Sequence, residues 1–294
     1  MNGERGSVVF LHAHPDDEAI FTGGTMALLA AAGWRTVLVL ATEGELGAPS
    51  PLVGPEVPLG VRRLAETARS AERLGAARVE FLGYRDSGMA GDPANTAPGA
   101  FAAASVDEAT ERLRRILVEE GAVALVTYDE RGGYGHPDHV QAHRVGILAA
   151  ERAGVATVYE ATVDREYLHF VETHLVVEAS RSVEPLGRAV LGLAASTLGL
   201  ATVEIDCTVD VRPVLATKRQ AMADHASQIP DACSAMRLPE SDFAAVYGFE
   251  WYARRGPPGP IDHQSHAAPE NGARAEGPGG ARPGATSLGA DEPH

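Results

Sequence analysis

The chain is poor in cysteine, with only Cys207 and Cys233 among its 294 residues. Two cysteines so far apart form neither a CxxC motif nor a framework of disulfides, which excludes the small disulfide-stabilised folds. A reducing compartment suits such a chain best. We therefore predict a cytoplasmic protein.

Positive charge and long apolar runs are also scarce. The formal net charge is −15, and no block rich in Lys and Arg stands out, so neither nucleic acid nor an anionic membrane surface is an expected partner. The most apolar late stretch, residues 189–200, is too short to span a bilayer. The first residues lack the cationic and apolar regions of a signal peptide, and we expect none.

Apolar residues make up 45% of the chain, and strand-like runs alternate with helix-like stretches. The expected strands cover residues 7–13, 36–43, 77–83, 122–128 and 155–161. The expected helices cover residues 25–34, 61–75, 106–121 and 137–154. Nearly continuous apolar strands separated by helices predict an α/β fold: a Rossmann-like, mostly parallel sheet with helices on both faces.

The alternation loosens after about residue 164. Residues 181–200 suit a lid, an oligomer contact or a helix over the sheet edge, so a homo-oligomer remains open. Residues 202–211 alternate in polarity like a strand with one buried face, and a helix is expected over 218–228. From residue 256 onward Gly, Pro and Ala dominate. We therefore predict one domain over residues 1–255, including this C-terminal strand and helix, and a disordered tail over 256–294.

Two polar clusters follow predicted strands. The first, HAHPDDE, covers residues 12–18, and the second, YDERGGYGHPDH, covers residues 128–139. In parallel sheets ligands bind beyond the carboxyl ends of the strands, so the two clusters can meet in space. The place after the first strand also lacks the GxGxxG glycines that cradle a nucleotide phosphate.

Together the two clusters offer ligands for a metal ion. Pro15 disfavours a helix at His14, so the first cluster is interpreted as a tight turn that aims His14 and Asp17 at one point. With His139 they form a three-ligand set, which is typical of catalytic zinc sites. Zn²⁺ is the expected ion, and Fe²⁺ also suits this set. The alternative is an ordinary polar turn with unrelated histidines, but two such clusters on one sheet favour the metal.

The remaining polar side chains of the clusters suggest distinct roles. Asp16 would be the general base beside a metal-bound water, and His136 would donate a proton or a hydrogen bond to an oxyanion. His143, one turn after the predicted ligand, is interpreted as a packing or surface residue, and His12 as a supporting one. Glu18 is expected to support the site or to lie at a helix N-terminus.

Residues 14–18, HPDDE, and residues 132–139, GGYGHPDH, resemble the PIG-L/LmbE-type family of zinc-dependent N-deacetylases. These enzymes remove an acetyl group from N-acetylglucosaminyl compounds, and they include the deacetylase of mycothiol biosynthesis and the mycothiol S-conjugate amidase. The resemblance runs from about residue 8 to 228. Residues 42–45, 85–89 and 218–228 support it.

The resemblance assigns a role to several residues of this chain. It implies that His14, Asp17 and His139 bind the metal and that Asp16 is the base that later protonates the leaving amine. His136 would stabilise the tetrahedral oxyanion. The same resemblance implies that Asp138 tunes an adjacent imidazole and that Tyr134 forms a hydrogen bond with the substrate carbonyl. It also implies that Arg63 and Asp86 bind sugar hydroxyls.

For Arg63 the alternative is an ordinary solvated charge on a helix. Residues 19–24, AIFTGG, lack the polar residues that the mycothiol enzymes carry there, so the resemblance extends to the chemistry better than to the substrate. The expected function is a metal-dependent hydrolase that removes an N-acetyl group from a small-molecule glucosaminide. The alternatives are an amidase that cleaves a larger N-acyl group, such as a mycothiol-type S-conjugate, and a non-catalytic sugar-binding module.

Overall fold

The computed structural model describes residues 6–51, 54, 56–171, 198–230 and 233–265. Their centre is a seven-stranded sheet of order β3-β2-β1-β4-β5-β7-β6. Five neighbouring strands are parallel: β1 (Ser7–His12), β2 (Arg35–Thr42), β3 (Arg78–Tyr84), β4 (Ala122–Tyr128) and β5 (Thr157–Thr162). Two antiparallel strands, β7 (Phe249–Arg255) and β6 (Cys207–Asp210), extend the sheet beyond β5. The predicted mostly parallel α/β fold is confirmed.

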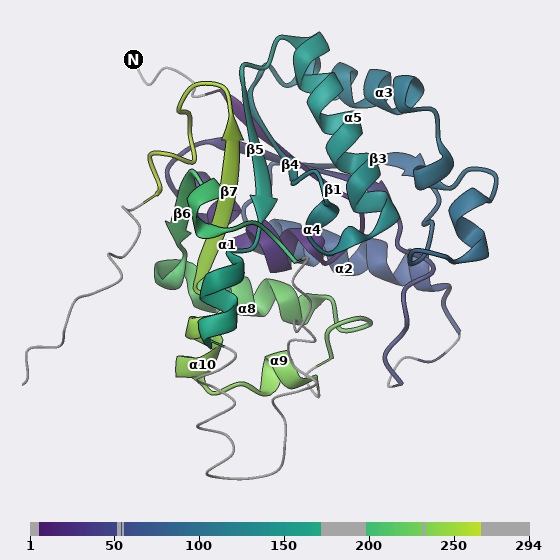
Figure 1. Ribbon diagram of the computed structural model, residues 1–294. Coiled ribbons are helices and arrows are strands. Elements are labelled where there is room, and N and C mark those ends of the chain that lie inside the picture. Colours follow the sequence, from purple (N-terminus) through teal and green to yellow (C-terminus); the bar gives the residue numbers. More distant parts are fainter. Residues whose placement is uncertain (1–5, 52–53, 55, 172–197, 231–232, 266–294) are drawn as a thin grey trace, which may run out of the picture.

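Helices cover both faces of this sheet (Figure 1). Successive strand residues point to opposite faces, so Val8 and Phe10 of β1 pack in one apolar cluster and Val9 and Leu11 in another. The first cluster contains residues of α1 (Gly23–Ala31), α2 (Leu59–Arg73) and α8 (Leu215–Asp224). The second contains residues of α3 (Val106–Glu119) and α5 (Pro137–Ala153).

Shorter helical segments connect these elements. A π-helical turn, η1 (Glu18–Thr22), leads into α1, and α4 (Gly132–Gly135) precedes α5. α9 (Ser234–Arg237) and α10 (Glu240–Tyr247) precede β7. Among the described residues, short 3₁₀ turns cover Pro93–Thr96, Phe101–Ala103, Thr202–Glu204 and Arg212–Val214.

The C-terminal part differs from the sequence prediction. The strand expected over 202–211 begins only at Cys207, and Val203 is 93% exposed. Thr202 instead starts a 3₁₀ turn, because its backbone N–H donates to Glu166 and its hydroxyl to Asp164. The helix expected over 218–228 runs over Leu215–Asp224, and β7 was not predicted.

The predicted disordered tail does not begin at residue 256. Ile261 is fully buried, and the Asp262 carboxylate accepts hydrogen bonds from the hydroxyl of Tyr159 and the thiol of Cys207. These contacts hold residues 256–265 against the sheet edge, so that part of the prediction is wrong. Residues 266–294, and the three alternatives for residues 181–197, lie outside the described residues.

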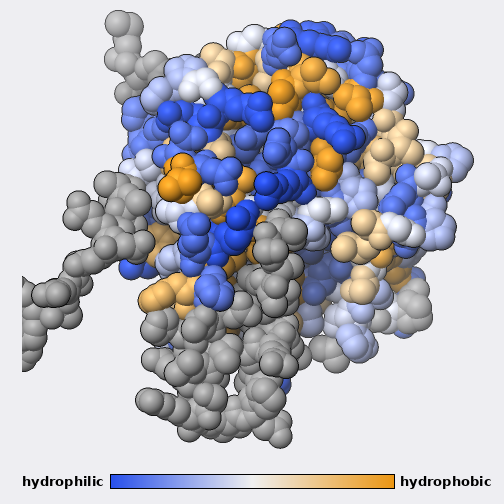
Figure 2. Space-filling model, in the orientation of Figure 1, coloured by the Kyte–Doolittle hydropathy of each residue, from blue (hydrophilic) through white to orange (hydrophobic). Residues whose placement is uncertain are grey.

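The molecular face over α3 and α5 is mostly hydrophilic, with apolar side chains scattered between charged ones (Figure 2). Such mixing is ordinary for a globular surface. Within the described ranges, no helix combines the length and the apolar character that a membrane crossing requires.

Candidate active site

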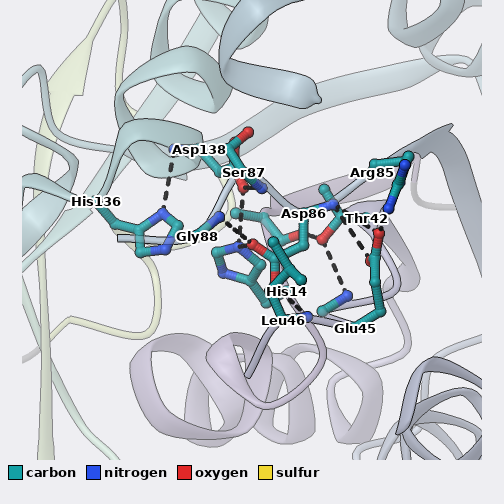
Figure 3. Close-up of polar contacts among 12 residues, drawn as sticks. His14, Thr42, Glu45, Leu46, Arg85, Asp86, Ser87, Gly88, His136 and Asp138 are labelled. Carbon is teal, nitrogen blue, oxygen red and sulfur yellow. Dashed lines mark hydrogen bonds and ion pairs between the residues drawn. The ribbon is translucent and has the colours of Figure 1, made fainter. Parts of the chain in front are cut away.

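The two polar clusters meet at the carboxyl end of the parallel strands, as predicted. His14 follows β1, and His136 and His139 lie at the start of α5, which follows β4. One ring nitrogen from each of these three histidines lies within 4.8 Å of the others. Asp86 and Asp138 are close to the same point, so segments more than a hundred residues apart form one site (Figure 3).

The turn after β1 is held by its own side chains. Among the described residues other than glycine, Asp16 alone has a positive φ, of 105°. Such a backbone costs about 1–3 kcal/mol and persists only where its surroundings fix it. Here the backbone N–H of His14 donates to Oδ2 of Asp17 at 2.9 Å, and that of Asp16 donates to Oε2 of Glu18 at 2.9 Å. The turn therefore presents His14, Asp16 and Asp17 in a fixed arrangement.

Glycine at position 132 allows the second cluster to close on itself. Gly132 has a φ of +65°, and a Cβ added there would lie 2.6 Å from the Cβ of His139. Its carbonyl oxygen is 3.1 Å from Nδ1 of His139. Because a carbonyl can only accept, Nδ1 of His139 carries a proton, and Nε2 is the ring nitrogen that faces the centre of the site.

Nε2 of His139 lies beside a carboxylate oxygen of Asp17. Nε2 of His139 is buried without a hydrogen-bond partner among the described residues and lies 3.3 Å from Oδ2 of Asp17. On the other side Nδ1 of His14 is also 3.3 Å from Oδ2 of Asp17, while Nε2 of His14 donates to Asp138 at 3.1 Å. Metal-binding histidines commonly give their second N–H to a carbonyl or a carboxylate in this way. The donor set therefore fits a bound cation.

The charges around His14 also favour a cation. Burial alone would lower the pKa of His14, but hydrogen bonds to Asp138, Asp17 and Asp86 raise it well above its usual value. Burial would raise the pKa of Asp17, but the neighbouring His139 and His14 hold that pKa well below its usual value. The site thus stabilises positive charge at its centre, which a metal ion also supplies.

A wider set of groups could in principle share the ion. Besides the three histidines, His14, Asp86, His136 and Asp138 form a second group of closely spaced ligand atoms. These groups also have partners within the protein: Nδ1 of His136 accepts from the backbone N–H of Asp138, Asp138 accepts from the backbone N–H and hydroxyl of Ser87, and Asp86 accepts from two backbone N–H groups. The predicted ligand Asp17 belongs to neither group, and its Oδ2 accepts from the backbone N–H of His14 and the hydroxyl of Tyr128.

Asp16 lies beside this centre with an arginine as its neighbour. Its Oδ1 is 3.3 Å from Nη2 of Arg63. The same guanidinium donates from Nη1 to the carbonyl oxygen of Gly44 and from Nη2 to that of Pro15. Burial raises the pKa of Asp16 to about 6, and the charge of Arg63 opposes that rise. Arg63 is only 3% exposed, so the alternative of a solvated helix charge is excluded.

His136 and Tyr134 complete the wall of the site. Burial, and the positive charges of His14 and His139, lower the pKa of His136 to about 4, so its ring is neutral at pH 7. Since Nδ1 accepts from Asp138, the Nε2–H group of His136 is a donor. Tyr134 is 48% exposed, and its ring centre lies 4.9 Å from that of His139.

Comparison with known proteins agrees with this geometry. A family model described as "PIG-L: GlcNAc-PI de-N-acetylase" matches residues 9–150. A 1D-myo-inositol 2-acetamido-2-deoxy-alpha-D-glucopyranoside deacetylase of Thermobispora bispora is 35% identical over 278 residues, which cover 86% of this chain and 89% of the relative. The chain belongs to the PIG-L family. The resemblance found in the sequence is thereby confirmed.

Two further comparisons extend the PIG-L assignment. A protein of the same name from Streptomyces scabiei is 41% identical over 272 residues, covering 83% of each chain. Among solved structures, an N,N'-diacetylchitobiose deacetylase from Pyrococcus horikoshii is similar with a TM-score of 0.55 and 22% identity. That match covers 90% of this chain and 88% of the other, and it shows a shared fold.

Other residues of this PIG-L chain contact the site although no sequence motif assigned them a role. The hydroxyl of Tyr128 donates to Asp17 at 2.8 Å and accepts from the backbone N–H of Ala13, and its ring stacks on His139 at 4.1 Å. The one signal in the sequence is that a tyrosine ends an otherwise aliphatic strand. His12 contacts Tyr128 and Thr22, which is the supporting position expected for it. His143 contacts the Tyr128 carbonyl and Glu160, away from the predicted ligands.

Glu18 connects the turn of Asp16 to distant parts of this PIG-L chain. While Oε2 accepts from Asp16, Oε1 accepts from the hydroxyl of Ser70 at 2.7 Å and from Nε2 of His225 at 2.6 Å. Glu18, Ser70 and His225 are all fully buried. His225 directly follows α8, so the C-terminal part of the chain fixes the backbone of Asp16 through Glu18.

We expect His225→Ala to lower kcat by about 10-fold to 100-fold, because a small displacement of a reacting group has effects of this size. KM and bound metal should stay near their wild-type values, since Nε2 of His225 bonds Glu18 and His225 is not among the closely spaced ligand groups of the site. Steady-state kinetics, metal analysis and thermal melting check this, with His263→Ala on the exposed surface as the matched control. An unchanged kcat in a folded variant would show that Glu18 needs no help from His225.

Proposed function

We propose that this chain is a metal-dependent hydrolase that removes the N-acetyl group of a small-molecule glucosaminide. One observation carries the proposal: Nε2 of His139, buried without a hydrogen-bond partner among the described residues, lies 3.3 Å from Oδ2 of Asp17 beside the carboxylate of Asp16. The activity named for the relatives at 35–41% identity supports the choice of substrate class.

We propose His14, Asp17 and His139 as the metal ligands. Two imidazoles and a carboxylate suit Zn²⁺ with an open position, and Fe²⁺ is the second choice for the same set. When bound, the ion would polarise the acetamide carbonyl and lower the pKa of a water molecule. Asp138 would orient His14 through the contact at 3.1 Å, as residues behind a metal ligand commonly do.

The side chains of the site supply the proton transfers. Asp16 would accept a proton from the attacking water and later give it to the leaving amine, while the C–N bond breaks and acetate forms. The neutral His136 would donate its Nε2–H to the developing oxyanion, and the hydroxyl of Tyr134 would donate at the mouth of the site.

The sugar would lie on the β3 side of the site. Asp86 follows β3, and its carboxylate is held by the backbone N–H groups of Leu46 and Gly88. We propose that it accepts hydrogen bonds from sugar hydroxyls. Arg63, which was expected to do the same, has Asp16 and two backbone carbonyls as its partners, so we assign it to positioning Asp16.

The proposed setting is the cytoplasm, since Cys207 and Cys233 are both free thiols. We propose that the catalytic domain extends from the start of the chain to residue 265, because Asp262 and Ile261 pack onto it.

Acetate release tests the function. The chain loaded with Zn²⁺ is incubated with a panel of N-acetylglucosaminides, including a myo-inositol glycoside, and acetate and free amine are measured. We expect equal amounts of both products from at least one substrate. A metal-loaded chain that binds these glycosides but releases no acetate would instead support the sugar-binding module.

A further inference from the structure

Ser87 is a fully buried serine in the loop that follows β3, and the proposed reaction gives it no part. Its hydroxyl donates to Oδ1 of Asp138, and its backbone N–H donates to Oδ2 of the same carboxylate at 2.9 Å. Asp138 lies in the first turn of α5 and is also fully buried. A single residue of the β3 loop thus holds both oxygens of a carboxylate that belongs to another element (Figure 3).

Asp138 is one of two carboxylates close to Nε2 of His14. That nitrogen lies 3.1 Å from Oδ2 of Asp138 and 3.6 Å from Oδ1 of Asp86. Because a hydrogen bond from nitrogen to oxygen is normally about 2.7–3.2 Å long, Asp138 rather than Asp86 accepts this proton. The bond fixes the orientation of the ring and leaves Nδ1, which faces Asp17, as the nitrogen for the metal.

The hydroxyl of Ser87 can point in only one direction. Its oxygen accepts from the backbone N–H of Ala102 at 2.9 Å, and a hydroxyl has a single proton to give. That proton is directed to Asp138. The backbone of Ser87 is fixed as well, since its carbonyl oxygen accepts from Nδ2 of Asn95 at 2.6 Å. Ser87 is therefore a rigid donor behind Asp138.

The neighbouring Asp86, the proposed sugar-binding residue, does not depend on the side chain of Ser87. Its carboxylate accepts from the backbone N–H groups of Gly88 at 2.8 Å and Leu46 at 3.2 Å. These backbone groups remain when the side chain at position 87 is changed. Adjacent residues of one loop therefore have separable partners, Ser87 on the metal side and Asp86 on the sugar side.

We propose, on the basis of the proposed function, that Ser87 is a positioning residue of the metal centre. By holding Asp138 it fixes the imidazole of His14 and raises the affinity of the site for its ion. Without the hydroxyl, Oδ1 of Asp138 loses a charge-assisted hydrogen bond at a buried position, and the carboxylate can turn away from His14. Residues behind a metal ligand change metal affinity about 10-fold to 100-fold, and Ser87 acts one contact further out.

The first test measures zinc affinity by competition with a chromogenic chelator and needs no substrate. We expect Ser87→Ala to raise the Kd for Zn²⁺ about tenfold, at the lower end of the range for such residues. The matched control Thr36→Val also deletes a buried hydroxyl, which donates to the Gly75 carbonyl near the amino end of β2, and should leave this Kd unchanged. Thermal melting of the metal-free chains shows whether they are folded. An unchanged Kd in folded Ser87→Ala would overturn the inference.

The second test determines whether Ser87 acts through Asp138. Residues that act through one contact have non-additive effects in a double-mutant cycle. In an Asp138→Ala background, adding Ser87→Ala should therefore change the Kd for Zn²⁺ by less than about twofold. If Ser87→Ala weakened zinc binding as much in that background as in the wild-type chain, its effect would be independent of Asp138 and the inference would be wrong.

Acetate release at saturating Zn²⁺ separates this inference from the proposed function. Under that condition Ser87→Ala should keep the KM of the wild-type chain for the glucosaminide, because Asp86 retains its backbone partners. A raised KM with an unchanged Kd for Zn²⁺ would assign Ser87 to the sugar site instead. Weaker zinc binding by Ser87→Ala, together with no hydrolysis of any amide by the wild-type chain, would support the role of Ser87 and refute the proposed function.

Discussion

Asp16→Asn is expected to lower kcat by about 1,000-fold, within the range that general bases contribute, while the chain keeps about one metal ion. The amide cannot accept the proton of the attacking water. The position itself should tolerate the change, because asparagine is among the residues that best adopt a positive φ, and the backbone N–H still donates to Glu18. Steady-state kinetics of acetate release and metal analysis on the same preparation measure both quantities.

The matched control for this variant is Asp107→Asn, since the side chain of Asp107 is 79% exposed at the start of α3. It should retain wild-type kinetics. Wild-type activity in Asp16→Asn would remove Asp16 from the mechanism. Loss of both activity and metal would show that Asp16, rather than acting as the base, holds the ion.

His139→Ala is expected to remove the bound metal and to lower kcat/KM by about 1,000-fold or more, since a catalytic ion contributes several kcal/mol. The substitution deletes Nε2, the proposed ligand atom. This atom is buried 3.3 Å from Asp17 and has no hydrogen-bond partner among the described residues. It also leaves Asp17 with one imidazole fewer to offset its charge. Metal content, kinetics and thermal melting of the purified variant are the measurements.

His143→Ala is the control for that experiment, because His143 lies one turn further along the same helix. Its Nδ1 contacts the Tyr128 carbonyl at 2.9 Å and Glu160 at 3.3 Å, so its loss should leave the metal in place. Retention of stoichiometric metal by His139→Ala, or its loss from His143→Ala alone, would reverse the assignment of these two histidines.

Most of the sheet was predictable because its parallel strands are short apolar runs between amphipathic helices. The site was predictable in outline for a related reason: parallel strands bring their carboxyl ends to one edge, so HPDDE and HPDH could meet there. The strand at Phe249–Arg255 was missed because FEWYARR mixes polar and apolar residues, as an antiparallel strand beside the sheet edge can.

Contacts between distant segments explain the rest of what the sequence did not reveal. Nothing local shows that the hydroxyl of Tyr128 reaches Asp17, or that His225 reaches Glu18 across more than two hundred residues. Arg63 resembles any charged residue of an amphipathic helix until the fold buries it against Asp16. Residues 256–265 have a composition typical of disorder, but one buried isoleucine and the hydrogen bonds of Asp262 are enough to fix them.

The central claim is that the cluster of His14, Asp17 and His139 holds a single catalytic metal ion. The most direct test is acetate release by the chelated, metal-free chain during titration with Zn²⁺, and in parallel with Fe²⁺ under anaerobic conditions. We expect no acetate release without metal, and a rate of release that rises linearly until one equivalent of metal per chain has been added. Full activity of the metal-free chain, or a rise that needs two equivalents, would contradict it.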